Sequence, residues 1–428
     1  MRCVMLVLIA SSCPAGGAAE NPATPRIPLC PGLTIVTAVA QQNGDYESIK
    51  TILTAGPKDV RLKYSAEAMN ADWLASGPPQ LKKVIVQRTM LTSDLESGNF
   101  YQQTFLEKSV EIIPGTTSIG TSAAVLKALK TKGEAELSIS NSYPGLELSA
   151  DRNKFPSYYH YMQAGKIRKV GPARVTVLVN DKPVELPAIQ AQGDFVGDKA
   201  EFFFLDDERN PLTLKFRLGI GAIQPLIPEA LKLCETAGKS RPIPGMLLGG
   251  GRCDMPKGGD RDTLRVIKST YRCAGPPAAN ASGTGPGQLP GGAGLLSGGA
   301  AAGGASALEK ALADTGKVDV YSIYFSFSSD NLREESEPTL KEIAEVLRRH
   351  PDWKLRVGGH TDGIGGDQYN LDLSRRRAAA VKDALVQRFR IDAGRLGTSG
   401  FGKSQPKDTN DTLEGRARNR RVELARGT

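Results

Sequence analysis

Histidine is scarce in this chain, which has only three among 428 residues. Histidine is the commonest general base and a frequent metal ligand near neutral pH, so the sequence offers little for acid–base catalysis. Paired acids such as Asp206 and Asp207 occur, but adjacent turn residues point apart and are usually solvated. No glycine-rich phosphate loop follows a predicted strand. We therefore expect no catalytic residues, no metal and no cofactor.

Long apolar runs are missing as well, because no segment reaches the roughly 20 residues that a membrane-spanning helix needs. The short run Val4–Ala10 follows Arg2 and precedes several small residues. This pattern is typical of a secretory signal peptide, and we expect residues 1–19 to be removed on export. A second interpretation stays open, because Ala10-Ser11-Ser12-Cys13 resembles a bacterial lipoprotein box. A lipid on Cys13 would then attach the protein to the outer membrane.

Cysteine is sparse, with six in the whole chain and two of them in the signal region. Cys30, Cys234, Cys253 and Cys273 remain, an even number that suits an oxidising compartment. We expect two disulfides among these four, and three pairings are possible. A metal site is disfavoured, because the last three cysteines are 19 and 20 residues apart with no histidine nearby.

Acidic residues are outnumbered by basic ones, and the formal net charge is +9. This excess suits an anionic partner such as nucleic acid, anionic lipid or an acidic polymer. The cluster Arg418–Arg421 adds to the basic character. Export argues against nucleic acid, so we expect an extracytoplasmic partner.

Charged residues almost vanish between Pro276 and Ala305, where glycine, alanine and proline dominate. Such a composition cannot bury a core, so we expect a flexible linker over residues 276–307. The linker divides the chain into an N-terminal region, residues 30–275, and a C-terminal domain, residues 318–428.

Alternating apolar and polar residues mark the N-terminal region. Leu212–Leu218 alternates and follows Glu201–Leu205 across a polar turn, which predicts a hairpin. A second hairpin is predicted from Val175–Val179 and Val184–Gln190, joined at Asn180-Asp181. Five further strands are expected over Leu33–Ala40, Val60–Tyr64, Lys83–Leu91, Glu134–Ser140 and Leu264–Tyr271. The region is therefore expected to be mainly β, with disulfides.

Helices are few in this region. Ser122–Lys130, closed by Gly133, and Pro228–Thr236, opened by a proline, are the two expected. The aromatic cluster Tyr158–Tyr161 includes His160, and we expect it to be packed rather than to form a binding patch. The N-terminal region resembles no family, and its protein partner stays unknown.

The C-terminal domain alternates strands and helices. Strands are expected over Val318–Phe325, Trp353–Gly359, Gly397–Phe401 and Arg421–Ala425. One helix carries Leu340, Ile343 and Leu347 on one face and ends before Pro351, and a second covers Asn370–Phe389. This strand–helix order requires crossover connections, so we expect an α/β sandwich, βαβαβ, with helices on one face.

Four short motifs stand in order along this domain. They are Gly359–Gly365 (GHTDGIG), Tyr369–Ala378 (YNLDLSRRRA), Gly400–Gly402 (GFG) and Gly415–Val422 (GRARNRRV). In order and spacing the domain resembles the OmpA-like C-terminal family, which includes OmpA, Pal and MotB. The resemblance implies a peptidoglycan-binding module in which Asp362 and Arg377 hold diaminopimelate. MotB fits least, because it needs a membrane-spanning helix.

The residues themselves support this chemistry. Asp362 follows a predicted strand, at the end where α/β folds place ligand sites. Asn370 and Arg377 are seven residues apart on the predicted helix, so both project from one face. A carboxylate and a guanidinium held together bind a zwitterion: Asp362 accepts an ammonium group and Arg377 binds a carboxylate. The side-chain centre of diaminopimelate in Gram-negative peptidoglycan is such a zwitterion.

Thr361, Tyr369, Asn370 and Arg421 complete the expected peptidoglycan site, although Asn370 has a second interpretation as the helix cap. The family often has acids after the first-strand phenylalanine (FDFDS), whereas residues 325–329 read FSFSS here, so a weaker affinity is expected.

The sequence therefore predicts a non-enzymatic periplasmic protein, associated with the cell wall and outer membrane, that anchors the envelope or its own N-terminal region to peptidoglycan. Two alternatives stay open. One is an outer-membrane β-barrel with a wall-binding domain, and the other is a wall-acting hydrolase.

Overall fold

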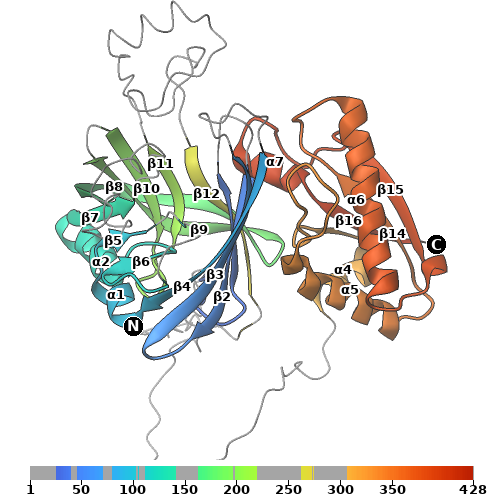
Figure 1. Cartoon of the computed structure of the whole chain (residues 1–428), viewed down its shortest axis with the longest axis horizontal. Helices are drawn as coiled ribbons and strands as arrows, with labels where there is room; N and C mark the ends of the chain where they lie inside the picture. The colour runs from blue at the N-terminus through green and yellow to red at the C-terminus, as the bar shows by residue number, and fades with distance from the viewer. Residues whose placement is uncertain are drawn as a thin grey trace, which may run out of the picture.

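The computed structural model describes residues 26–39, 46–70, 80–102, 105, 111–140, 162–195, 198–218, 262–271, 273 and 306–427. These residues form an N-terminal β domain and a C-terminal α/β domain that lie side by side (Figure 1). Five predictions fall outside the described residues: the signal segment with Cys13, the Tyr158–Tyr161 cluster, the helix Pro228–Thr236, the cysteines Cys234 and Cys253, and nearly all of the linker. None of the described helices has both the length and the apolar character to cross a membrane.

The N-terminal domain is one sheet in the order β4-β3-β2-β1-β12-β11-β10-β9-β8-β7-β5-β6. Its strands are β1 (Thr34–Val39), β2 (Tyr46–Ala55), β3 (Asp59–Asn70), β4 (Gln80–Leu91), β5 (Phe100–Tyr101), β6 (Thr116–Thr117), β7 (Glu134–Ser140), β8 (Met162–Val179), β9 (Lys182–Phe195), β10 (Asp198–Leu205), β11 (Thr213–Leu218) and β12 (Asp262–Thr270). The end of β8 also pairs in parallel with β12, which closes β8 to β12 into a ring of five strands.

Both predicted hairpins are confirmed. β8 and β9 meet across Asn180 and Asp181, whose φ angles are 48° and 62°, as a two-residue type I′ turn requires. β10 and β11 form the second hairpin. The predicted helix is α2 (Ala123–Lys132), which Ser122 caps by accepting the Val125 N–H at 3.3 Å. A short helix, α1 (Thr92–Ser97), and the strand β2 were not predicted.

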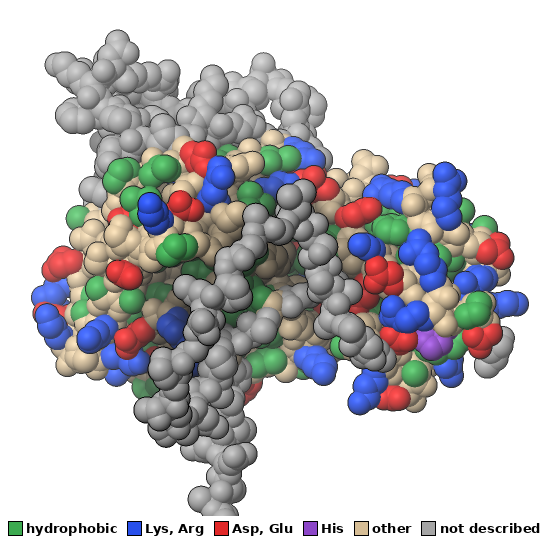
Figure 2. Space-filling model, turned by 90° about the horizontal axis from the view of Figure 1, so that it is seen from below, with side chains coloured by type: hydrophobic (Ala, Val, Ile, Leu, Met, Phe, Trp, Pro, Cys, Tyr) green, Lys and Arg blue, Asp and Glu red, His purple; other side chains and the backbone are tan. Residues whose placement is uncertain are grey.

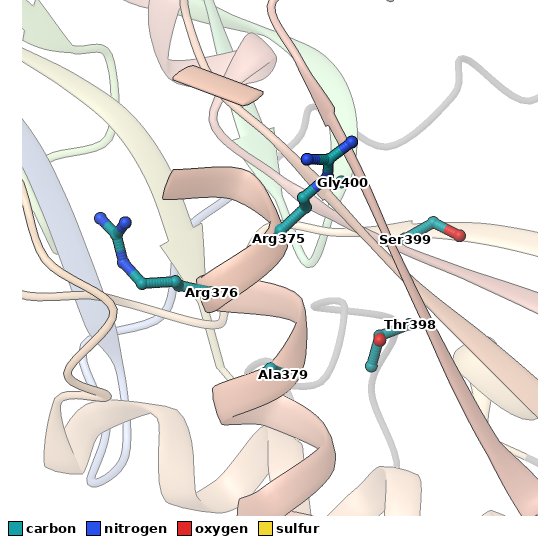
Figure 3. Close-up of a pocket in the computed structure, with 6 residues that line it drawn as sticks. All are labelled: Arg375, Arg376, Ala379, Thr398, Ser399 and Gly400. Atoms are coloured by element: carbon teal, nitrogen blue, oxygen red, sulfur yellow. The ribbon is translucent and has the colours of Figure 1, made fainter. Parts of the chain in front are cut away.

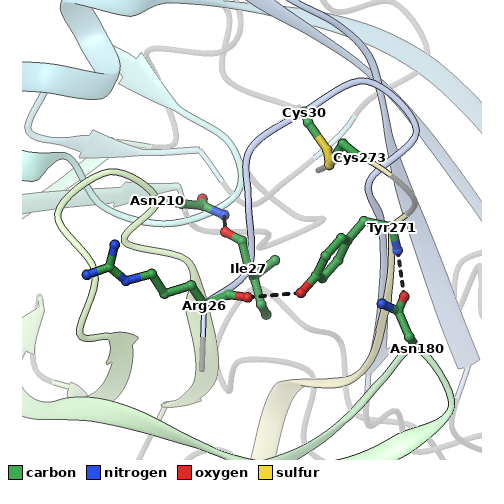
Figure 4. The surroundings of a disulfide bond; sticks show 7 residues. All are labelled: Arg26, Ile27, Cys30, Asn180, Asn210, Tyr271 and Cys273. Carbon is green, nitrogen blue, oxygen red and sulfur yellow. Dashed lines mark hydrogen bonds between the residues drawn. A yellow bond between two sulfur atoms is a disulfide. The ribbon is translucent and has the colours of Figure 1, made fainter. Parts of the chain in front are cut away.

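A disulfide joins Cys30 to Cys273 and ties the segment before β1 to the segment after β12 (Figure 4). Side chains around it anchor the same entry segment. The Tyr271 hydroxyl donates to the Arg26 carbonyl at 3.1 Å, and the Asn210 amide donates to the Ile27 carbonyl at 3.0 Å. Cys234 and Cys253, the other two predicted disulfide cysteines, lie outside the described residues.

Replacing Cys30 and Cys273 together by serine should lower the free energy of unfolding by about 2–5 kcal/mol, because the bridge closes a long loop in the unfolded chain. The change should appear as a lower denaturant midpoint in urea titrations followed by circular dichroism. An unchanged midpoint would show that the bridge adds nothing to stability.

The C-terminal domain has a four-stranded sheet in the order β13-β16-β14-β15. Its elements are α4 (Ala307–Thr315), β13 (Lys317–Val320), α5 (Glu337–Arg349), β14 (Lys354–His360), α6 (Asp367–Gln387), β15 (Leu396–Gly402), α7 (Leu413–Asn419) and β16 (Val422–Gly427). Side chains of α5, α6 and the sheet share one buried core, as the predicted sandwich requires.

Three features of this domain differ from the prediction. The first strand ends at Val320 rather than Phe325, because residues 321–324 leave the sheet as a buried segment. Helix α6 begins at Asp367 with Gly366 as its cap, so the interpretation of Asn370 as the cap is wrong. Helix α7, within the GRARNRRV motif, was not predicted.

The two domains are in contact where one face of strands β1, β2 and β12 packs against α7 (Figure 1). A small buried apolar cluster fills the contact. It consists of Val36, Ala38, Ile49 and Ile267 from the N-terminal domain and Tyr324, Leu413 and Ala417 from the C-terminal domain. Acidic and basic side chains are interspersed over the C-terminal domain, as the view from below shows (Figure 2).

Candidate functional site

Asp362 lies two residues beyond the end of β14, where the sequence placed it. One carboxylate oxygen accepts the Ile364 N–H at 3.0 Å, and the other accepts Nη1 of Arg420 at 2.7 Å. Thr361 is buried beside it, and its backbone N–H donates to the Gly402 carbonyl at 2.9 Å. The carboxylate is therefore fixed in position at the carboxyl end of the sheet.

The glycines of the motifs bring α6 onto the sheet. A Cβ atom at Gly359 would lie 2.2 Å from the Ser374 carbonyl oxygen, so only glycine allows this approach. Ser374 Oγ in turn accepts the Gly402 N–H at 2.9 Å, which ties the helix to the end of β15. These contacts set the depth of α6 against the Asp362 loop.

Asn370 shapes the loop between Asp362 and α6. It is buried, and its side-chain amide donates to the Ile364 carbonyl at 2.9 Å. Gly365 adopts a positive φ of 93° in the same loop, a conformation that favours glycine. Gly363 donates its N–H to Asn410 at 2.7 Å. Asn370 thus holds the loop in position from helix α6, through its bond to Ile364.

Arg377 lies two turns further along α6, on the same face as Asn370. Its Nε donates to the Ser329 carbonyl at 2.9 Å, and its guanidinium lies over the Phe325 ring, 4.9 Å from the centroid. Burial and then the positive charge of Arg420 lower the pKa of Arg377 to about 10, although Asp362 opposes this shift. It remains cationic at neutral pH, close enough to Asp362 for the two charges to interact.

No ion pair joins Asp362 to Arg377 among the described side chains. Asp362 instead pairs with Arg420, whose charge also acts on Arg377. Arg420 follows α7 and was not among the predicted site residues. Burial would lower the pKa of Arg420, but two neighbouring carboxylates, Glu47 and Asp362, raise it above the ordinary value. The GRARNRRV motif was the signal that could have drawn attention to Arg420.

The segment 325–329 forms the other wall of the site. Ser328 Oγ is hydrogen-bonded to the hydroxyl of Tyr369, which is half exposed on the first turn of α6. The neighbouring Ser329 supplies the carbonyl that holds Arg377. Serine hydroxyls and backbone carbonyls thus line the positions where the related family often has acids. Asp330 turns away and pairs with Arg376 at 3.3 Å.

Arg421 lies apart from this group. Its side chain is buried, with Nε on Asp319 at 2.9 Å and Nη2 on the Gln405 carbonyl at 3.1 Å. It ties β16 to β13 and presents no group toward the Asp362 loop. Thr361, Asp362 and Asn370 therefore belong to the Asp362 loop or bond to it, whereas Tyr369 and Arg377 contact the segment 325–329. Arg420 bonds to Asp362, and Arg421 makes a structural contact.

His360 ends β14 next to the site but faces the interior. Its side chain is 2% exposed and stacks on Phe401 with 4.8 Å between ring centroids. Neither ring nitrogen has a hydrogen-bond partner among the described residues. Burial, followed by the charge of Arg421, lowers the pKa of His360 to about 4, so the imidazole is neutral at physiological pH.

Between pH 6.5 and about 4, His360 should make stability pH-dependent. In this window the unfolded chain binds a proton that the folded chain does not, so the free energy of unfolding should fall by about 1.4 kcal/mol per pH unit as pH decreases. His360→Phe should remove this contribution in urea titrations across the window. Parallel pH profiles for the variant and the parent would contradict it.

A shallow groove of about 450 Å³ lies between α6 and β15 (Figure 3). It is lined by Arg375, Arg376, Ala379, Thr398, Ser399 and Gly400. Residues 375, 376 and 379 face away from Asn370 and Arg377 on the helix, because successive residues turn by about 100°. The groove is therefore distinct from the Asp362 loop.

Comparisons with known proteins match this part of the chain. The family model described as the OmpA family covers residues 324–420. Outer membrane porin F of Pseudomonas aeruginosa is 43% identical over 101 residues, which are 24% of this chain and 29% of the porin. The peptidoglycan-associated lipoprotein of Agrobacterium fabrum is 36% identical over 100 residues, 23% of this chain and 56% of the lipoprotein.

A solved structure described as the cell wall anchor of the T6SS from Pseudomonas aeruginosa is 32% identical, covering 28% of this chain and 97% of that chain, with a TM-score of 0.24. The chain spans less than two thirds of the length of the two curated relatives, and these matches fall in its C-terminal part.

Proposed function

Because residues 324–420 belong to the OmpA family, we propose that this protein is a non-enzymatic anchor that binds the diaminopimelate of peptidoglycan through Asp362 and Arg377. The observation that carries the proposal is that one carboxylate and one guanidinium are fixed near the same arginine. Asp362 accepts the Ile364 N–H and bonds to Arg420, while Arg377 is held by the Ser329 carbonyl and feels the charge of Arg420. The name of one relative, a peptidoglycan-associated lipoprotein, agrees with this role.

Each charge has a defined task in this proposal. Asp362 accepts the ammonium group of diaminopimelate, which replaces Arg420 on one carboxylate oxygen. Arg377 binds the side-chain carboxylate with the Nη groups left over after Nε has been satisfied by Ser329. Thr361 and Asn370 hold the loop, and Tyr369 borders the opening.

The pairing of charges also predicts a preference among stem peptides. A stem peptide with lysine in place of diaminopimelate keeps the ammonium group but has no side-chain carboxylate. Arg377 would then lose its ligand partner, and a site built to bind a charged group discriminates strongly against an analogue without it. Cosedimentation with purified Gram-negative sacculi tests the proposal.

The site of action in this proposal is the periplasm. The Cys30–Cys273 disulfide supports it, since such bonds persist in oxidising compartments. The two interpretations of the N-terminal segment differ in their consequence. Removal of residues 1–19 leaves the protein without a lipid, whereas lipidation of Cys13 attaches it to the outer membrane. Mass spectrometry of the mature N-terminus distinguishes the two.

A further inference from the structure

Glu47, on β2 of the N-terminal domain, reaches into the proposed peptidoglycan site. Its Oε1 accepts Nε and Nη2 of Arg420 at 3.1 and 2.5 Å, while Nη1 of the same guanidinium donates to Asp362 at 2.7 Å. The exposed fractions of the three side chains are 27% for Glu47, 22% for Arg420 and 13% for Asp362. One guanidinium therefore links a site residue to a residue 315 positions earlier in the chain.

Glu47 is an anion in this position. Burial alone would raise its pKa, but the charges of Arg420, Lys268 and Arg333 outweigh burial, and the pKa lies below its ordinary value. A carboxylate from the N-terminal domain thus binds Arg420, and its charge also acts on Arg377, where the ligand carboxylate is expected to bind.

We propose that the N-terminal domain blocks this site when no peptidoglycan is bound, with Glu47 supplying a carboxylate of the same chain. Peptidoglycan binding then displaces the N-terminal domain. This inference rests on the proposed function and adds its regulation. Wall binding and domain docking compete at Arg420, because docking holds this guanidinium between Glu47 and Asp362, whereas the ligand ammonium has to replace it on Asp362.

The contact between the domains is specific enough to place Glu47. Arg333 of the C-terminal domain donates to the Ser65 hydroxyl at 2.9 Å and to the Ser65 carbonyl at 3.1 Å. Arg265 on β12 pairs with Glu414 on α7 at 2.6 Å. These bonds flank the Glu47–Arg420 pair and fix the register of β2 against the C-terminal domain.

The same contact is suited to reversible separation. The C-terminal domain contributes three side chains to the small apolar cluster in this contact, and ion pairs and hydrogen bonds surround the cluster. Interfaces of this kind within one chain permit relative domain motion. The glycine- and alanine-rich linker composition keeps the separated domains together at an effective concentration near the millimolar range.

Docking then lowers the apparent affinity for the wall, because only the undocked fraction binds. In the full chain, Glu47→Gln keeps the side-chain size and removes the charge. It should tighten binding of a soluble tetrapeptide containing meso-diaminopimelate roughly tenfold, measured by calorimetry, since a bond between charged groups is lost from the docked state only. Glu134→Gln, an exposed acid on β7, removes the same charge and should leave binding unchanged.

A second variant tests the docking itself. Arg265→Glu places a negative charge opposite Glu414, far in sequence from Glu47, and should also tighten binding. Small-angle scattering should show a larger radius of gyration for both variants, and for the parent once the tetrapeptide is added. If Glu47→Gln binds like the parent, or more weakly because Glu47 belongs to the ligand site, the competition is refuted. Tightening by Glu47→Gln without any by Arg265→Glu refutes displacement of the domain.

The two proposals fail in distinguishable ways. If the parent binds, and Asp362→Asn does not, the proposed function stands whatever Glu47→Gln does. If neither the parent nor Glu47→Gln binds the tetrapeptide or sacculi, both proposals are overturned together.

Discussion

Asp362→Asn should weaken binding of the full chain to sacculi by about a hundredfold. The substitution keeps the size of the side chain and its ability to accept the Ile364 N–H, but it removes the negative charge that faces the ligand ammonium. Breaking one partner of a desolvated charge pair costs roughly 3 kcal/mol or more, which is the source of this factor. Cosedimentation across a range of sacculus concentrations gives the affinity.

Asp372→Asn is the matched control, because Asp372 lies on the exposed side of α6 and pairs with Arg376. It changes the net charge by the same amount and should bind like the parent. Circular dichroism of both variants establishes that the fold is retained. Equal sedimentation of Asp362→Asn and the parent would remove Asp362 from the site.

Arg377→Lys should also abolish most of the binding, although it preserves the charge. Nε of Arg377 is held by the Ser329 carbonyl, which leaves the Nη groups for a carboxylate. A lysine ammonium cannot keep the contact with Ser329 and present two parallel donors at once. We expect a loss of tenfold to a hundredfold, on the order of 1.5–3 kcal/mol, in the same assay.

The comparison for Arg377→Lys is Arg375→Lys, an exposed arginine that lines the groove on the other side of α6. Binding by Arg375→Lys should match the parent. If Arg377→Lys binds as well as Arg375→Lys, a point charge suffices and the two-bond recognition of the carboxylate is wrong. If Arg375→Lys is the weaker binder, the ligand lies in the groove instead.

Local patterns were enough to place Asp362 after a strand and Arg377 on a helix, whereas their role in a site came from the family resemblance. A strand that ends just before Asp362 and a helix with Asn370 and Arg377 on one face follow from short-range periodicity, and the structure has both. The start of α6 was misplaced because Asn370 is a common capping residue, whereas the glycines before Asp367 allow the helix to begin one turn earlier.

Strand β2 was not predicted, for a different reason. Alternation identifies a strand with one exposed face, but Ser48, Ile49 and Lys50 are all buried, since the N-terminal core covers one face of β2 and the C-terminal domain covers the other. A register shift between Ile52 and Thr54 interrupts the pattern further. The Glu47–Arg420 contact joins residues 373 positions apart, and no local signal encodes it.

In the proposed anchor, which is held by the wall through its C-terminal domain, the Cys30–Cys273 bridge has a mechanical consequence. Tension from the wall would enter the N-terminal domain where the chain leaves Cys273, at the end of the β1–β12 ladder, whose pairs begin with Thr34 and Thr270. Without the bridge, this pull would peel β12 from β1 one hydrogen bond at a time. With the bridge, the disulfide transmits the force to the segments next to both strands, so the hydrogen bonds between β1 and β12 are not broken one after another.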